Sequence, residues 1–236
     1  MDAELIRRQS ALEEGHWWFR ARAEIVGDLF PPGDPERQIL DVGCGWGGLT
    51  SHLTRHGRVR GVEPSEAARE EAARRGLTVL EGSAEALPAE DGSIDVALVS
   101  DVLEHLDDDL VALREVHRVL RPGGIAVITV PAYAWLYSAH DRALEHRRRY
   151  SRRRLVRAVR AAGLEPVRIT HYNALLFLPS AAIRLIRRNK PPAEDARPTW
   201  GPLNAVLYRI FAAERGMLRR RSLPFGLSLA MVASRP

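Results

Sequence analysis

The feature that most constrains the fold is a regular alternation of short apolar segments with helix-like segments between residues 38 and 131. The apolar segments, each typical of a buried strand, span residues 38–43, 59–64, 77–82, 93–100 and 125–131. Helix-like segments follow at 48–57, 65–76 and 106–124, and the glycines or prolines near their ends predict where each helix stops. Repeated strand–helix units place successive strands parallel in one sheet. We therefore predict an α/β fold with a doubly wound, Rossmann-like sheet.

Two more strand-like segments, at 166–172 and 223–234, bring the predicted sheet to seven mostly parallel strands. Residues 173–222 lie between them and are mostly helical and basic, so we predict a helical insertion before the last strand, with a loop at 191–202. A helix is expected over residues 2–29. A chain of 236 residues suits one sizeable domain, and we predict a single domain over 1–236 with a helical cap at 1–37.

The turn after the first strand, "ILDVGCGWGGLT" at residues 39–50, predicts a ligand site. Its glycines at 43, 45 and 48 have the G-x-G-x-x-G spacing of dinucleotide sites, and ligands bind beyond the carboxyl ends of parallel strands. Asp41 lies two residues before the first glycine, where it would repel a pyrophosphate by roughly 1–4 kcal/mol. A ligand with a cationic, phosphate-free tail avoids this repulsion, and S-adenosylmethionine is such a ligand.

Five segments between residues 38 and 131 resemble the motifs of the class I S-adenosylmethionine-dependent methyltransferases. In chain order they are "ILDVGCGWG", "GVEPS", "LEGSAEALP", "IDVALVSDVLEHL" and "VLRPGGIAVITVP". The resemblance implies S-adenosyl-L-methionine as the cofactor and methyl transfer as the reaction. It also implies that residues 38–131 form the cofactor-binding core and that 132–236 form the acceptor-side region.

The same resemblance implies roles for particular residues around the cofactor. Glu63 would hold both ribose hydroxyls, and Arg22 of "HWWFRAR" would pair with the cofactor carboxylate, unless this segment only packs on the sheet. The family often has an acid where Ser83 stands; the serine can still accept the bond from the adenine amino group, or Glu85 or a backbone carbonyl could make this contact instead. Glu104 and His105 of "LEH" are expected to orient the cofactor loop. The expected cofactor-binding residues are Trp18, Arg22, Asp41, Gly43, Cys44, Gly45, Glu63, Pro64, Ser83, Ala84, Glu85, Ser100, Leu103 and His105.

Candidate catalytic residues come from "SAHDRALEHRRRY", residues 138–150, where the substrate loop of this family begins. His140 or His146 could be a general base that Asp141 orients, because histidine titrates near neutral pH. The three residues could also hold a metal or only cap a helix, and our assignment includes no metal site. Cys44 is the only cysteine, which excludes a multi-cysteine zinc site, and we expect it to fill space rather than to act as a nucleophile.

Charge divides the chain into an acidic and a basic part. Residues 1–120 hold 13 basic and 24 acidic residues, a balance of −11, whereas residues 121–236 hold 22 and 6, a balance of +16. The basic part could be a solvated surface or a face for anionic ligands. Its apolar and arginine-rich segments could also contact a membrane peripherally. RNA binding is less favoured, because no recognisable RNA-binding module accompanies the charge.

Together these features predict methylation of a small acceptor that is anionic or hydrophobic, such as a natural-product or glycolipid intermediate. The alternatives are an RNA methyltransferase, a non-catalytic membrane-associated protein that binds S-adenosylmethionine, and, least favoured, a nicotinamide-dependent reductase. The N-terminus lacks the apolar core of a signal peptide, so a cytoplasmic location is expected. The oligomeric state and the acceptor atom stay open.

Overall fold

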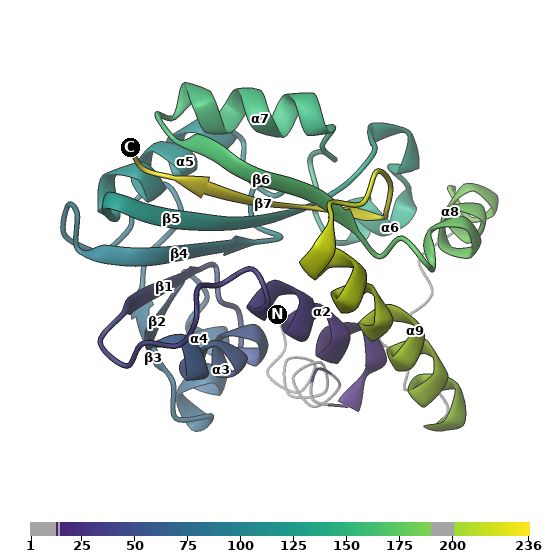
Figure 1. Ribbon diagram of the computed structural model, residues 1–236, viewed down its shortest axis with the longest axis horizontal. Coiled ribbons are helices and arrows are strands. Elements are labelled where there is room, and N and C mark those ends of the chain that lie inside the picture. The colour runs from purple at the N-terminus through teal and green to yellow at the C-terminus, as the bar shows by residue number, and fades with distance from the viewer. Residues whose placement is uncertain (1–12, 14, 190–200) are drawn as a thin grey trace.

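The computed structural model describes residues 13, 15–189 and 201–236. In this part of the chain seven strands form one sheet in the order β3-β2-β1-β4-β5-β7-β6. They are β1 (Gln38–Val42), β2 (Arg58–Glu63), β3 (Thr78–Glu81), β4 (Ile94–Ser100), β5 (Leu120–Pro131), β6 (Glu165–Tyr172) and β7 (Ser228–Ser234). Neighbouring strands are parallel except that β7 runs antiparallel to both β5 and β6. The predicted α/β class and Rossmann-like sheet are confirmed (Figure 1).

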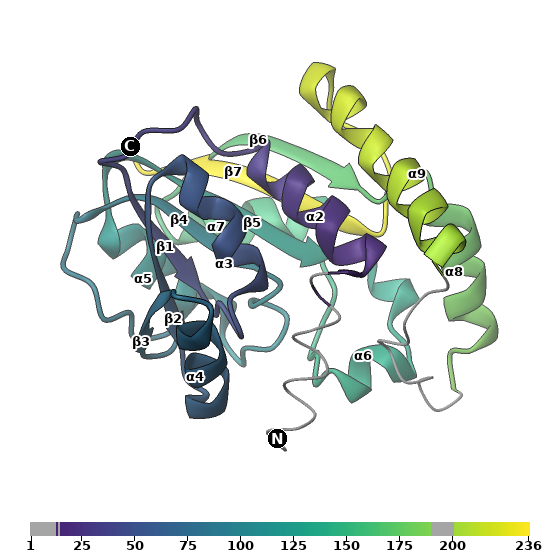
Figure 2. The same ribbon diagram turned by 90° about the horizontal axis from the view of Figure 1, so that it is seen from below.

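Helices cover both faces of this sheet (Figures 1 and 2). The longer ones are α2 (Trp17–Gly27), α3 (Gly48–Leu53), α4 (Glu66–Arg74), α5 (Asp109–Val119), α7 (Arg152–Ala161), α8 (Phe177–Ile186) and α9 (Gly201–Arg220). Short turns form η1 (Thr54–His56), η2 (Ala134–Leu136) and α6 (Ala139–Ala143). On one face, Leu113 of α5 and Val159 of α7 join the largest core cluster. On the other, Val26 of α2 and Leu53 of α3 pack with the strands.

Three helices begin directly after a capping side chain. The side chains of Ser65, Asp108 and Ser151 each accept a hydrogen bond from the first turn of the helix that follows, α4, α5 and α7. Gly76 follows the end of α4 with φ +75°, a conformation that favours glycine. Local capping chemistry therefore fixes where these connections between strands turn.

Strand β5 begins earlier than the sequence indicates. We expected Pro122, Gly123 and Gly124 to separate α5 from a strand over 125–131, but β5 already starts at Leu120, which pairs with Ile94 of β4. The register shifts between Ile94 and Val96, so the strand accommodates the irregular segment as a bulge. A Cβ on Gly124 would meet carbonyl oxygens at about 3 Å, which explains why glycine stands there.

Helix α9, in the region expected as an insertion, packs along α2 on the same face of the sheet (Figure 2). Arg215 holds the two helices together, since it pairs with Asp28 at 2.8 Å and with Glu24 at 2.6 Å. We expected one helix over residues 2–29, but it is interrupted at His16, whose extended backbone and side chain cap α2 (Trp17–Gly27). Residues 1–12 and 14 lie outside the described residues. The loop expected at 191–202 also lies outside them, except that its last two residues begin α9.

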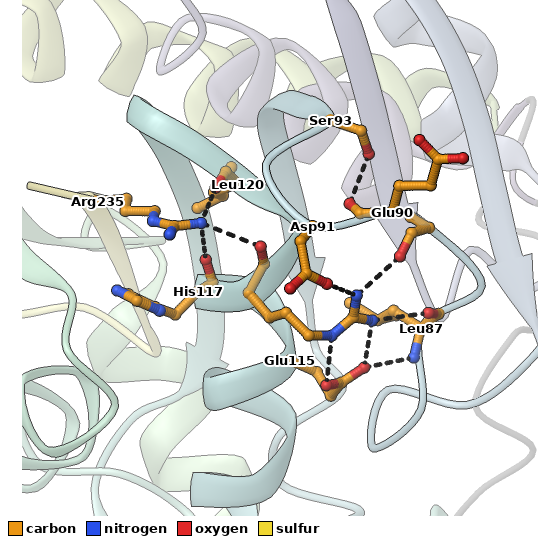
Figure 3. Close-up of polar contacts among 10 residues, drawn as sticks. Leu87, Glu90, Asp91, Ser93, Glu115, His117, Leu120 and Arg235 are labelled. Carbon is orange, nitrogen blue, oxygen red and sulfur yellow. Dashed lines mark hydrogen bonds and ion pairs between the residues drawn. The ribbon is translucent and has the colours of Figure 1, made fainter.

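Polar contacts hold the end of α5 where the chain passes into β5 (Figure 3). Arg235 donates to the carbonyls of His117, Arg118 and Leu120, which the end of the helix leaves without helical partners. The guanidinium of Arg118 bonds Glu115 at 2.7 Å and the Leu87 carbonyl at 3.0 Å. These contacts tie α5 to the loop between β3 and β4.

No helix among the described residues is long and apolar enough to cross a membrane.

Candidate functional site

The loops that follow β1, β2 and β4 meet at the carboxyl edge of the sheet. Gly43 and Gly45 have φ of +68° and +54°, and the Gly43 N–H donates to the Val62 carbonyl at 2.8 Å. A Cβ on Gly43 would lie 2.7 Å from a methyl of Val102 in the loop after β4. Gly47 also has a left-handed φ, +82°, whereas Gly48 is the first residue of α3. The glycines thus let the backbone turn tightly at the site.

Glu63 ends β2 and braces this turn. One carboxylate oxygen accepts the N–H of Gly45 at 3.0 Å, and the other accepts the N–H of Ser65 at 3.0 Å. The side chain therefore stands between the loops after β1 and β2, with an oxygen on each side. A carboxylate oxygen has more than one acceptor site, so these bonds leave capacity for a ligand hydroxyl.

Asp41, the carboxylate in β1 that precedes the turn, is buried. Its Oδ2 accepts a 2.6 Å hydrogen bond from the Thr50 hydroxyl of α3. Burial is the main cause that raises the pKa of the Asp41 carboxyl to about 7, although the bond from Thr50 opposes the rise. A buried carboxylate of this kind gains from a cation beside it.

This raised pKa predicts that Asp41→Asn stabilises the protein at high pH and weakens cofactor binding. The native carboxyl keeps its proton between the ordinary pKa of 3.8 and about 7, where the unfolded chain has lost it. The native protein therefore loses stability as pH rises through this window. Asparagine removes that loss, so we expect a gain of about 1–3 kcal/mol at pH 8 and little at pH 4. Urea unfolding at both pH values measures it, and a loss of stability at pH 8 would contradict the explanation.

Arg22 of α2 reaches the end of β4. Its Nη2 donates to the Ser100 hydroxyl at 2.6 Å and pairs with the Asp101 carboxylate. The guanidinium also lies 5.0 Å from the ring centre of Trp18. Burial would lower the pKa of Arg22, but the charge of Asp101 raises it above its usual value, so the guanidinium stays charged. Asp101 itself has φ +54°, an uncommon conformation for a residue other than glycine.

A cavity of about 310 Å³ lies beside Arg22, between α2 and the start of α3. Phe19, Arg22, Gly48 and Arg75 are among the residues that line it. The Nε of Arg22 is buried and has no hydrogen-bond partner among the described residues. A buried donor of this kind fits a ligand that brings an acceptor, such as a carboxylate. The volume is at the lower end of the roughly 300–1,000 Å³ usual for small-molecule sites.

The other expected cofactor residues lie at the same edge but differ in exposure. Pro64 and Glu85 are exposed, and Ala84 is buried. Ser83 forms an isolated bridge with Ala86. Leu103 is fully buried in the main core cluster, so its backbone is the part that can face a ligand. These cofactor assignments stay predictions.

Cys44 packs against β2 at the centre of the turn. A Cβ on Gly61 would lie 2.5 Å from the Cys44 sulfur, so β2 needs glycine at this position. Burial raises the pKa of the Cys44 thiol far above its ordinary value. A thiol in this state is a poor nucleophile, which agrees with the expectation that Cys44 fills space.

Asp141 and His146 form a hydrogen-bonded pair in the segment that follows β5. Asp141 is fully buried in α6 and accepts bonds from the Ser138 N–H at 2.9 Å, Arg149 Nε at 2.7 Å and His146 Nδ1 at 3.2 Å. Burial alone would raise the pKa of Asp141, but the bonds from His146 and Arg149 hold it well below its usual value. An ionised Asp141 accepts the Nδ1 proton of His146, which leaves Nε2 as the basic nitrogen.

The structure groups His146 with the "LEH" residues of the loop after β4. Its ring lies edge-on to His105, with 4.7 Å between the ring centres, and Glu104 is the third member of the cluster. His140 lies on α6 outside this cluster. The sequence led us to assign His105 and His146 to separate roles. It also did not identify Asp101, which pairs with Arg22, or Thr50, which bonds Asp41, as residues of the site. Asp101 could have been found because it directly follows the carboxyl end of β4.

Comparisons with known proteins agree with this arrangement. A family model described as a methyltransferase domain matches residues 40–128. The chain is 38% identical over 133 residues to an "Uncharacterized methyltransferase" of Mycobacterium sp. (strain KMS), covering 52% of each protein. It is 32% identical over 161 residues to a "Probable S-adenosylmethionine-dependent methyltransferase" of Mycolicibacterium smegmatis, covering 65% of this chain and 62% of that protein. The chain thus spans about half to three fifths of the length of these relatives.

Among solved structures, the fold is similar to geranyl diphosphate C-methyltransferase from Streptomyces coelicolor A3(2). That crystal structure contains Mg²⁺, geranyl diphosphate and S-adenosyl-L-homocysteine. The TM-score is 0.65 at 19% identity, and the match covers 92% of this chain and 78% of that one. At this identity the similarity shows the shared fold.

Proposed function

We propose that this chain, which belongs to the class I S-adenosylmethionine-dependent methyltransferases, methylates a small hydrophobic acceptor. One observation carries the choice of cofactor and therefore of reaction. The glycine turn, Asp41 and Glu63 converge at the carboxyl edge of the sheet, where the two carboxylates suit a ligand without phosphate. When bound, S-adenosylmethionine supplies a methyl group on a positively charged sulfur, so that an acceptor lone pair is sufficient for transfer.

The residues around the turn suit the parts of this cofactor. We assign Glu63 to the ribose hydroxyls, because its oxygens already stand between the two loops. Asp41 lies where a carboxylate favours the cationic end, and Arg22 offers its buried, unpartnered Nε to the cofactor carboxylate. Ser83 and Ala84 would meet the adenine.

An aromatic cluster on the acceptor side favours a hydrophobic acceptor. Tyr133, in the left-handed region at φ +63°, stacks on His171 with 5.4 Å between ring centres. Phe177 lies 5.5 Å from Tyr133 and 5.8 Å from Phe225. Trp135 and Phe225 are each 48% exposed, which is high for large aromatic rings and is typical of a surface that binds a ligand. These rings could bind the apolar part of an acceptor.

The Asp141–His146 pair is the proton acceptor that we assign to the site. It is needed only if the attacking atom carries a proton that must leave. The buried, ionised Asp141 binds Nδ1 of His146 and so holds the imidazole in one orientation, which leaves Nε2 to accept a proton. Product mass spectrometry with deuterium-labelled S-adenosylmethionine and a panel of hydrophobic alcohols, phenols and acids tests the function. A labelled product supports it, and binding without turnover of any class favours a non-catalytic protein.

We also propose that α8 contacts an anionic lipid surface from which a hydrophobic acceptor would come. Leu178 and Ile186 are each 75% exposed on this helix, and Arg187 and Arg188 follow directly and are exposed. Apolar side chains beside cations are typical of interfacial helices. Arg219 on α9 is less suitable for such contact, because it pairs with Asp28 at 3.0 Å.

Liposome flotation tests this surface with a matched control. The wild-type protein should float with anionic vesicles, float less with neutral ones and be released at high salt, since each arginine near the surface contributes about 1 kcal/mol. The double variant Leu178→Ser/Ile186→Ser should bind clearly less. Val167→Ser is the control, because Val167 is 66% exposed but lies on β6. Absence of wild-type binding at low salt, or equal loss in the control, would refute membrane contact.

A further inference from the structure

Glu104, His105 and His146 form a cluster of metal-ligand side chains that the proposed function uses only in part. One ligand atom from each residue lies within 4.8 Å of those of the other two. Glu104 and His105 belong to the loop after β4, and His146 lies between α6 and α7. The fold thus brings together two imidazoles and one carboxylate from segments about forty residues apart.

Glu104 points to a ligand independently of this spacing. Its side chain is fully buried, and neither carboxylate oxygen has a hydrogen-bond partner among the described residues. A buried carboxylate without partners is costly, and native proteins rarely leave one unsatisfied. A cation bound at the cluster would be coordinated by one of these oxygens and would balance the charge of the carboxylate.

His146 is oriented as a metal ligand usually is. Its Nδ1 bonds the buried Asp141 at 3.2 Å, which leaves Nε2 with a free lone pair. Histidines that bind metals commonly donate their other nitrogen to a carboxylate in this way. His105 is exposed at the other side of the cluster, so its ring has room to adjust. Ligand atoms around zinc lie about 3.3–3.6 Å apart, so the cluster would contract by at most about 1.5 Å.

The arginines that follow His146 do not prevent cation binding, because acidic groups or carbonyls engage them. Arg147 pairs with Asp107, and Arg148 lies 3.4 Å from Asp109. Arg149 donates to Asp141 and to the Ala132 carbonyl. Their charges are therefore largely balanced near the cluster.

We propose that Glu104, His105 and His146 bind one divalent transition-metal ion of the zinc type. Two imidazole nitrogens and one carboxylate oxygen match catalytic sites of this kind, which keep an open position. The proposal rests on the proposed function in one respect: the open position would take an oxygen of the acceptor, which makes an alcohol, phenol or acid the substrate class. His146 would then serve as a ligand, and the metal would lower the pKa of the bound acceptor oxygen so that its proton passes to solvent water before the oxygen takes the methyl group.

Metal binding is measured directly on the tag-free protein, without an acceptor. Dialysis against Zn²⁺ followed by elemental analysis should give one ion per chain, and Co²⁺ should develop visible absorption from nitrogen ligands. Glu104→Gln, His105→Gln and His146→Gln should each weaken Zn²⁺ binding at least about a hundredfold, since loss of even a neighbouring supporting group costs about ten- to a hundredfold. His117→Gln, on α5 outside the cluster, is the matched control and should bind as the wild type does.

Each outcome decides the proposal separately from the methyltransferase function. Thermal unfolding identifies variants that fail to fold. If Glu104→Gln fails to fold, His105→Gln still tests the site, because His105 is exposed and its replacement leaves the core intact. S-adenosylmethionine binding by the wild-type protein is titrated in parallel, so its absence there would count against the proposed function only. Absence of a bound ion in the wild type, or binding that all three variants retain, would overturn the metal site. Methyl transfer that resists chelators would return His146 to the role of base.

Discussion

Glu63→Ala should weaken the binding of S-adenosylmethionine and of S-adenosylhomocysteine about ten- to a hundredfold. The change removes a carboxylate that would accept hydrogen bonds from both ribose hydroxyls, and charge-assisted bonds of this kind contribute about 1.5–3 kcal/mol. It also removes the bonds to the Gly45 and Ser65 N–H groups, which hold the loops after β1 and β2 at their present spacing. Calorimetric titration of both ligands measures the effect.

Two companion variants separate ribose binding from a general loss of structure. Glu63→Gln keeps the shape and one acceptor oxygen, so its affinity should fall between those of wild type and Glu63→Ala. Glu66→Ala removes an exposed acid in the first turn of α4 and should bind almost as the wild type does. Equal affinity in wild type and Glu63→Ala would show that Glu63 does not contact the cofactor.

His146→Ala should lower turnover about a hundredfold or more while S-adenosylmethionine affinity holds. The imidazole is directed by the buried Asp141 and lies in the cluster with Glu104 and His105, on a segment outside the glycine turn and Glu63. Loss of a positioned proton acceptor costs about a hundred- to ten-thousandfold in rate, and loss of a ligand of the proposed metal ion would also lower the rate, because either role prepares the acceptor for methyl transfer. Single-turnover kinetics with saturating cofactor and an acceptor identified by mass spectrometry measures this loss.

His140→Ala is the informative comparison, because the sequence treats the two histidines alike. His140 lies on α6 outside the cluster, so its replacement should reduce turnover less than His146→Ala does. Unchanged turnover in both variants would leave alignment of the acceptor as the whole contribution of the protein. A larger loss of turnover in His140→Ala than in His146→Ala would indicate that the acceptor binds beside His140 of α6 rather than beside His146.

The sheet and the glycine turn could be predicted because their signals are local. Each signal determines the structure of only a few neighbouring residues. These signals are apolar runs of strand length, capping residues such as Ser65 and glycines at left-handed positions. Parallel strands then bring the ends of β1 and β2 to the same edge, which places Asp41 near Glu63 without any long-range information. Glu63 lies at the end of β2 as the motif "GVEPS" implies.

Contacts between distant segments could not be predicted from the sequence. The pairing of Arg22 with Asp101 joins residues 79 positions apart, and the grouping of Glu104 with His146 depends on how the segment after β5 folds back over the β4 loop. Strand β5 was predicted to start too late because Pro122 and two glycines normally end regular structure, whereas here a bulge accommodates them. In each case tertiary packing decides what local propensity leaves open.

Direct calorimetric titration of the wild-type protein with S-adenosylhomocysteine, and separately with a nicotinamide dinucleotide, tests the central claim. The arrangement of Asp41, Glu63 and the glycine turn predicts one binding site for S-adenosylhomocysteine and no measurable heat with the dinucleotide, whose pyrophosphate would meet the Asp41 carboxylate. Tight binding of the dinucleotide without binding of S-adenosylhomocysteine would contradict the assignment of this site.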